Sequence, residues 1–370
     1  MIFLILNGVI GFVSNTMLIS RFGFTELLDE YYFKISIPMI IASILYQSIG
    51  QIFLSRLIRY RKSKIEKSVF ILLPTLALIV SGVIAFLLWL FLKHQSSYLL
   101  YTALFLLPMV GTTVLHAQKR FIIPEIMIFI SAIIYLVPVY LQLNIDIILQ
   151  IFMLKNFFWI GLILFLDKSN MRGHVYCLRL YFKAFRSISL LAIPKSQGIF
   201  DRFLLNSIGV GYLTAFNYAS QISAVLIQII NKLVVSIAVV QDLSSNNKTP
   251  KKLTGIICFT LIILCVIEVI FLNEALTSFI IGEINGFPKI HFLILTLGMS
   301  NLLNLLKEYN FTLIFRYSFL TPATIEVVCF IAGCFLKLIA SVYYGIIGFI
   351  LIYFADYLAR YFWSNKRVMP

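Results

Sequence analysis

Three ionisable side chains lie inside one hydrophobic segment of the chain. Lys195, Asp201 and Arg202 all belong to the stretch PKSQGIFDRFLL, residues 194–205. Lys195 and Arg202 are seven residues apart, nearly two helical turns, so a helix would present both on one face. An ammonium and a guanidinium together suit the oxygens of a phosphate or pyrophosphate group. The spacing therefore predicts an anion-binding face within an apolar helix.

Amide side chains form a polar stripe on the next hydrophobic segment, and a second stripe lies closer to the N-terminus. The first stripe recurs at intervals of four, seven and four residues: Asn217, Gln221, Gln228 and Lys232. The second includes Gln47 and Gln51. Amides donate and accept hydrogen bonds, as sugar hydroxyls do, which predicts that both stripes line a water-filled cavity. The alternative is that the amides bond neighbouring helices and that the charges are paired structural ions.

Acidic residues in apolar segments indicate a second kind of chemistry. Asp201, Glu326 and Asp356 are interpreted as a site for a coupling cation, Na⁺ or H⁺. No glycine-rich phosphate-binding loop occurs, so transport would draw on an ion gradient, the membrane potential or the substrate gradient. An equally weighted alternative is a plain ion pair of Asp201 with a neighbouring cation. The scattered histidines predict no metal site, no other cofactor is expected, and no nucleophile–base pair predicts an enzyme.

The composition is that of an integral membrane protein. Of 370 residues, 61% are hydrophobic and 12% are charged, whereas soluble domains average about a quarter charged residues. The net charge of +15 in such a chain reflects the distribution of basic loops, so it predicts no nucleic-acid partner.

Twelve apolar segments are long enough to cross the hydrocarbon, which takes about 20 residues. They are 2–20, 35–55, 68–92, 98–116, 121–143, 147–166, 187–208, 211–238, 254–272, 290–306, 321–342 and 345–363. An even number of spans places both termini on the same side of the membrane.

The basic residues of the loops predict which side that is. Nearly all of them fall on one side of these spans, and Lys307 and the terminal Arg360 are counted there. By the positive-inside rule both termini are predicted to be cytoplasmic. Arg360 is interpreted as a membrane-edge anchor. Lys155 and Lys337, which lie within spans, are interpreted as structural charges.

Two internal similarities divide the spans into two sets of six. Tyr31, Ile35 and Ser36 recur as Tyr218, Ile222 and Ser223, and Phe121 and Pro124 recur as Phe319 and Pro322. Transporters built from parallel repeats hold their substrate between the halves. The predicted fold is therefore all-α and polytopic, with about twelve transmembrane helices in two six-helix repeats facing a central cavity. The halves are 1–168 and 187–370, joined by a basic cytoplasmic linker at 169–186.

Several stretches resemble the lipid II flippases (MurJ-like) and the related polysaccharide flippases. They are FGFTELLDEYYFKISIPMIIASILYQSIGQIFLSRL (22–57), FDRFLLNSIGVGYLTAFNYASQISAVL (200–226), LHAQKRFIIPE (115–125) and FRYSFLTP (315–322). Asp201, Gly211, Tyr218 and Ala219 occupy matching places. The resemblance covers nearly the whole chain. It implies the fold of the multidrug/oligosaccharidyl-lipid/polysaccharide exporter superfamily and transport of a polyprenyl-linked saccharide.

The chain departs from the lipid II flippases at positions where they carry arginine. Ser14 and Asn15 follow Gly-Phe-Val, and Ala42 and Ser43 follow Ile-Pro. These departures favour an O-antigen, capsule or related envelope-glycan precursor, flipped across the bacterial inner membrane beside other glycan-assembly proteins. Lipid II remains one alternative. A membrane glycan polymerase or ligase is another, disfavoured because the longest predicted outer loop, 273–289, has no histidine.

Overall fold

The structure is a computed structural model that describes residues 2–60, 63–92, 97–117, 120, 122–161, 196–230, 290–314 and 320–368. Within these ranges the regular elements are helices, and none of the described residues forms a strand. The all-α prediction is confirmed. The predicted span at 254–272 and the predicted linker at 169–186 lie outside the described residues.

The helices follow the predicted apolar segments. The helices of the N-terminal part are α1 (Ile2–Phe22), α2 (Glu26–Tyr60), α3 (Ser63–Leu92), η1 (Ser97–Tyr101), α4 (Thr102–Ala117), α5 (Ile122–Tyr140) and α6 (Ile145–Leu154). Those of the C-terminal part are α9 (Gln197–Ile208), α10 (Tyr212–Ile230), α14 (Ile290–Ile314) and α15 (Leu320–Val368). Prolines lie inside α2, α3, α4 and α5, as is common where neighbouring helices take over the freed backbone groups.

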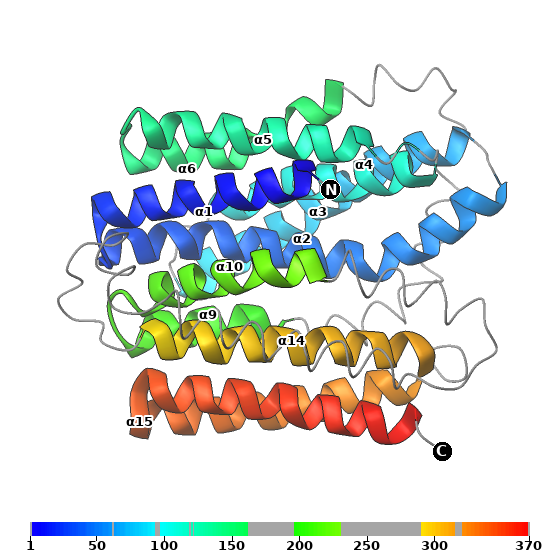
Figure 1. The fold of residues 1–370 in the computed structure, drawn as a ribbon. Helices are drawn as coiled ribbons and strands as arrows, with labels where there is room; N and C mark the ends of the chain where they lie inside the picture. The colour runs from blue at the N-terminus through cyan, green and yellow to red at the C-terminus, as the bar shows by residue number, and fades with distance from the viewer. Residues whose placement is uncertain are drawn as a thin grey trace. The chain divides into compact units, whose positions relative to one another are not determined.

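Helix α15 combines two predicted spans that reverse direction at one glycine. Gly345 has φ 57° and ψ −140°, a conformation in which a Cβ would be strained. The residues on either side form two limbs, 320–344 and 346–368, which run back along each other (Figure 1). The predicted spans 321–342 and 345–363 therefore correspond to two real helical limbs with almost no loop between them.

Helix α6 ends earlier than its predicted span, 147–166. Asn144 caps its N-terminus, because its side chain accepts a hydrogen bond from the Asp146 backbone N–H. Regular α-helix stops at Leu154, and the next bonds span three residues, from Trp159 N–H to the Asn156 carbonyl for example. The turn at 155–157 interrupts the helix, which resumes over 158–161.

The chain divides into two compact units. The first unit comprises Met1–Ser14 and Glu30–Phe203, and the second comprises Asn15–Asp29 and Leu204–Pro370. In the first unit, a core around Ile37, Ile41 and Leu99 joins α2, α3, η1 and α9. In the second unit, α14 packs against both α10 and α15. The predicted border between halves at 169–186 remains a prediction, since those residues are not described.

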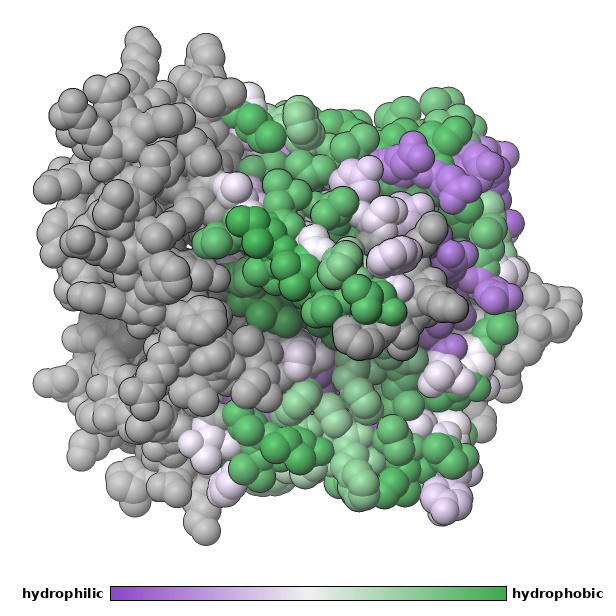
Figure 2. Space-filling view, turned by 180° about the vertical axis from the view of Figure 1, so that it is seen from behind, coloured by the Kyte–Doolittle hydropathy of each residue, from purple (hydrophilic) through white to green (hydrophobic). Residues whose placement is uncertain are grey.

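Helix α3 shows why the surface suits lipid. Its outer face carries exposed apolar side chains at intervals of four, three and four residues: Ile79, Val83, Phe86 and Leu90. Its inner face is apolar as well, with Ile84 and Leu88 packed into the core of the first unit. A helix that is apolar all round belongs in a large core or in a membrane. Hydrophobic residues likewise dominate the described surface in Figure 2.

Two helical stretches in the described ranges are long and apolar enough to cross a membrane by themselves. They are Ile122–Tyr140 and Thr324–Ser364, and the second includes both limbs of α15. Shorter apolar helices lie at Pro74–Leu90 and Ser97–Thr112.

Candidate functional site

Helix α9 carries Asp201 on its buried face and Arg202 beside it. Gln197, Asp201 and Leu205 follow one another at intervals of four residues, and all three are buried. The Arg202 guanidinium donates to the Gly198 carbonyl oxygen one turn earlier, at 3.0 Å from Nη1. Lys195 lies outside the described residues, so the face that it was predicted to share with Arg202 stays a prediction.

The start of helix α10 is held by a carboxylate that sequence reasoning had not singled out. Asp29 is buried, and its side chain accepts from the Gly211 N–H, the Thr214 N–H and the Thr214 hydroxyl. The last two contacts measure 2.7 and 2.6 Å. Free N–H groups and a positive partial charge at a helix N-terminus favour an anion there. Gly211 enters this turn with φ 84°, a conformation that suits glycine.

The polar stripe of α10 coincides with the less buried face of the helix. Asn217 and Gln221 are half-buried, as is Ser220 between them, whereas Phe216, Tyr218 and other apolar neighbours are buried. The stripe is not simply exposed, however, because Asn217 Nδ2 is itself buried and has no hydrogen-bond partner among the described residues. Gln228 lies in α10, and Gln47 and Gln51 lie in α2, but their side chains fall outside the described residues, and so does Lys232.

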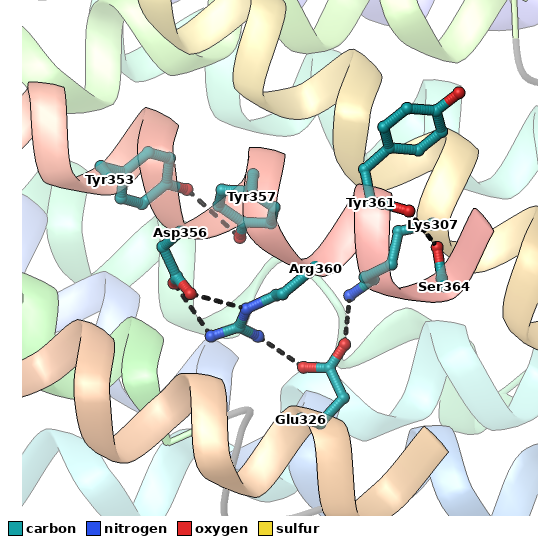
Figure 3. A network of polar contacts seen from close by, with 8 residues as sticks. All are labelled: Lys307, Glu326, Tyr353, Asp356, Tyr357, Arg360, Tyr361 and Ser364. Carbon is teal, nitrogen blue, oxygen red and sulfur yellow. Dashed lines mark hydrogen bonds and ion pairs between the residues drawn. The ribbon is translucent and has the colours of Figure 1, made fainter. Parts of the chain in front are cut away.

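A buried ionic network lies in the second unit and joins α14 to both limbs of α15 (Figure 3). Arg360 donates to both carboxylate oxygens of Asp356, from Nε and Nη2, each at 2.9 Å. It also donates through Nη1 to Glu326. Lys307 of α14 reaches the other oxygen of Glu326 at 2.8 Å. We call Lys307, Glu326, Asp356 and Arg360 the ion quartet.

The charges of the ion quartet cancel one another. Two acids face two bases, and all four residues are buried, Arg360 with only 3% of its surface exposed. Glu326 and Asp356 were predicted to help to bind a coupling cation. Both already contact a cation of the protein itself, which favours the alternative of paired structural ions for these two. Asp201, the third acid of the predicted cation site, belongs to the other compact unit, so it is described separately from the ion quartet.

Two sequence-based assignments were wrong. Lys307 was counted with the cytoplasmic loops and Arg360 was interpreted as a membrane-edge anchor, but both are buried within helices. In the sequence, a charged residue at the end of an apolar segment is typical of an exposed helix end, and both residues occupy such positions. Burial follows instead from Glu326 and Asp356, which stabilise the bases where hydropathy alone would exclude them. The spacing of four residues between Asp356 and Arg360 was the one available signal.

Among the described charged residues of the second unit, Lys337 is the most deeply buried, at 0% exposure. Its Nζ lies 4.6 Å from the centre of the Tyr353 ring and 5.5 Å from that of Phe349, and both rings also contact Phe216 of α10. These contacts stabilise an ammonium through the ring faces. This packing favours the interpretation of Lys337 as a structural charge, which stays a prediction.

Comparisons with known proteins show which proteins share this fold. No protein-family model matches the chain, and none of the curated proteins matches it either. Solved structures do. One is the lipid II flippase MurJ in an inward closed conformation, with a TM-score of 0.76 and 15% identity over 98% of this chain and 86% of that one. The chain has the fold of the MurJ and MATE transporters.

Two MATE structures support the same conclusion about the fold. An inward-facing multidrug resistance MATE family transporter of the MOP superfamily has a TM-score of 0.66 and 14% identity, over 98% of this chain and 94% of that one. A MATE transporter from Vibrio cholerae has a TM-score of 0.57 and 13% identity, over 99% of this chain and 93% of that one. The prediction of a polytopic, all-helical membrane fold is confirmed, and the structures that share it belong to transporters and flippases.

Proposed function

We propose that the chain is a flippase that moves an undecaprenyl-diphosphate-linked saccharide from the cytoplasmic to the outer leaflet by alternating access. The observation that carries the proposal is the likeness to the lipid II flippase MurJ, which spans 98% of this chain. A lipid-linked saccharide needs a polar path for its headgroup. The half-buried polar face of α10, with Gln221 and with Asn217, whose buried Nδ2 has no partner among the described residues, supports such a path.

The substrate we propose is an O-antigen, capsule or related envelope-glycan precursor. The positions where the lipid II flippases carry arginine hold no base in this chain. Ser14 is buried and its hydroxyl donates to the Ile10 carbonyl, and Ser43 donates to the Ile40 carbonyl, each at 2.8 Å. These hydroxyls are satisfied by their own helices, so they supply no charge to a lipid II diphosphate. Lipid II itself is the alternative substrate.

The remaining headgroup contacts are part of the same proposal. We assign the headgroup phosphates to Lys195 and Arg202, and the sugar hydroxyls to the polar stripes of α10 and α2. The stripe residues are Asn217, Gln221, Gln228, Lys232, Gln47 and Gln51. Other glycan-assembly proteins are proposed as partners, because a flipped precursor must be polymerised or transferred afterwards.

A flipping assay tests the proposal directly. Purified protein in liposomes would receive a fluorescent short-chain polyprenyl-diphosphate saccharide in the outer leaflet, and an impermeant quencher would report the protected fraction. Protein-dependent protection of O-antigen-type and capsule-type lipids, but not of lipid II, is the expected result. Equal transport of lipid II would favour the alternative substrate.

Two other outcomes of the same assay address different functions. Export of organic cations without any lipid movement would favour a drug exporter, a function that the MATE neighbours make worth testing. Elongation or transfer of the saccharide by the purified protein would favour a membrane polymerase or ligase.

The proposed location is the bacterial cytoplasmic membrane, with both termini in the cytoplasm. Cysteines introduced at Ser63 and Ser169 should be shielded from impermeant thiol reagents in whole cells. A cysteine at Asn285 should react from outside. Labelling at Ser63 in intact cells would reverse this orientation.

Coupling to a cation, Na⁺ or H⁺, is proposed through Asp201. The carboxyl is buried in α9, and a charge that moves across the membrane potential gains roughly 2.3 kcal/mol per 100 mV. Asp201→Asn keeps the shape and removes the charge, so flipping should lose its response to an imposed gradient or potential. Asp146→Asn, at the exposed start of α6, is the control. A mutant that still responds as the wild type would leave Asp201 as one partner of an ion pair.

A further inference from the structure

The first unit contains a group of hydrogen-bond donors that lacks acceptors. Lys155 follows directly after α6, Tyr135 belongs to α5, Tyr31 to α2, and Trp159 lies one turn beyond Lys155. We call Lys155, Tyr135 and Tyr31 the donor cluster, because the Lys155 ammonium lies over the Tyr135 ring and the Tyr135 hydroxyl bonds that of Tyr31. Buried polar groups are normally hydrogen-bonded, so a surplus of donors at one place indicates a missing acceptor.

Lys155 is the charged member of the donor cluster. Its Nζ lies 3.6 Å from the centre of the Phe152 ring and 5.1 Å from that of Tyr135. No acidic side chain in the described part of the chain pairs with it, in contrast to Lys307. Ring faces compensate an ammonium only in part, and a charge at membrane depth is normally paired. Part of the Lys155 residue is exposed.

The neutral members of the cluster can also donate a hydrogen bond. The hydroxyls of Tyr31 and Tyr135 are 2.8 Å apart, and both side chains are buried. One O–H donates to the other oxygen, which leaves the second O–H without an acceptor in the described ranges. Outside the cluster, four residues beyond Lys155, Trp159 is completely buried, at 0% exposure, and its Nε1–H has no partner among the described residues.

An ammonium beside two phenol hydroxyls fits an anion with several oxygens. The same set of groups disfavours a metal ion or a cationic ligand, since the described residues of the cluster include no carboxylate. Serine and asparagine nearby do not change this, because Asn156 Oδ1 already accepts from the Ser131 hydroxyl at 3.2 Å.

We propose that the donor cluster is a binding site for a phosphate or diphosphate group, in the first unit, carried by the lipid that the protein moves. The proposal rests on the proposed function and adds a position for the headgroup charge. It also gives Lys155 a role other than the structural one expected from the sequence. Charge-assisted hydrogen bonds from Lys155 supply most of the affinity, and the neutral donors orient the oxygens.

Binding of farnesyl diphosphate to the purified full-length protein tests the site. Wild type should bind it, and Lys155→Met should bind at least about tenfold more weakly, a difference of roughly 1.4 kcal/mol. Lys155→Arg should recover much of the loss, because it keeps the charge. Lys337→Met is the matched control, a buried lysine over aromatic rings in the other unit, and should bind as the wild type does.

Two further probes identify the source of the anion. Farnesol, which has the chain without the diphosphate, should not bind at this site. Inorganic pyrophosphate should bind more weakly than farnesyl diphosphate, and equal affinity would assign the site to a free anion rather than to the translocated lipid. If Lys155→Met does not fold, a chemical protection experiment on the wild-type protein tests the site instead. Farnesyl diphosphate should then shield Lys155 of the wild-type protein from an amine-acylating reagent, as read by mass spectrometry.

A failure of the proposed site can be distinguished from a failure of the proposed function. Equal farnesyl diphosphate affinity in wild type and Lys155→Met, or unprotected Lys155 in the saturated wild type, would overturn the donor cluster while leaving the proposed function intact. A wild-type protein that binds neither diphosphate would overturn both the site and the proposed class of substrate.

Discussion

The ion quartet of the second unit and the donor cluster of the first solve the same physical problem in opposite ways. In the ion quartet, Arg360 and Lys307 face Asp356 and Glu326, and each charge has an opposite charge in contact. In the donor cluster, Lys155 faces two aromatic rings and no carboxylate of the described residues. The comparison teaches that burial of a charge does not by itself mark a site, and that Lys155 is a candidate because it lies beside two donor hydroxyls without a carboxylate of the described residues.

The difference separates stability from binding. Removing one member of a compensated group leaves its partners buried and unpaired, which destabilises the folded state strongly. Removing an uncompensated cation leaves no unpaired partner and relieves a desolvation penalty. Variants in the second unit should therefore change stability first, and variants of the donor cluster should change ligand binding first.

Arg360→Met should have the largest effect. It leaves Asp356 and Glu326 with too little positive charge, and the free energy of unfolding should fall by about 3–5 kcal/mol. Denaturant unfolding of the purified protein in detergent measures this. A quadruple variant with Lys307→Met, Glu326→Gln, Asp356→Asn and Arg360→Met should recover much of the loss. A single Arg360→Met variant with wild-type stability would show that the contacts in Figure 3 do not hold α15 together.

Gly333→Ala should have an intermediate effect. A Cβ at Gly333 would lie 3.1 Å from the Asp356 carboxyl group, so the added methyl pushes that group away from Arg360. Overpacking of this kind destabilises by about 1–3 kcal/mol. Gly161→Ala is the matched control, because its Cβ would meet nothing within 4 Å. Equal melting temperatures of the two variants would contradict the tight packing of Gly333 against the ion quartet.

Lys155→Met should have the smallest effect on stability. The variant loses a cation–π contact, worth about 0.5–2 kcal/mol, and gains a similar amount because no ammonium remains to be desolvated. Its thermal unfolding without ligand should match that of the wild type, while addition of farnesyl diphosphate should raise the melting temperature of the wild type only. A large intrinsic loss would mean that Lys155 has a structural partner after all.

Much of the fold could be predicted from the sequence because hydropathy reports on single helices. The segments predicted at 2–20, 68–92 and 290–306 correspond to α1, α3 and α14, and a break between 342 and 345 corresponds to Gly345. These features depend on local composition. The end of α6 at Leu154 could not be predicted, because it follows from three-residue hydrogen bonds and not from a loss of hydrophobicity.

The charged groups were harder to predict because their compensation is tertiary. Glu326 and Asp356 were recognised as acids in apolar segments, but their partner Arg360 was placed at the membrane edge. The spacing of four residues to Asp356 was the one local signal, and it does not tell a buried arginine from an anchoring one, because the second carboxylate that pairs with Arg360 lies 34 residues away. Asp29 was missed for the same reason, since its role depends on α10, more than 180 residues further on.

The reversal at Gly345 has a consequence for how the chain enters the membrane. Two limbs joined by almost no loop can insert as a helical hairpin, and one limb carries Glu326 while the other carries Asp356 and Arg360. Inserted singly, a charged side chain at the centre of a spanning helix is unfavourable by about 2.5–3.5 kcal/mol on biological insertion scales. Inserted as a hairpin, the limbs can pair Arg360 with the two carboxylates, which leaves one net negative charge for Lys307 to neutralise. The glycine thus favours biogenesis of the last two spans as one unit, with Lys307 of the preceding helix in place to join them.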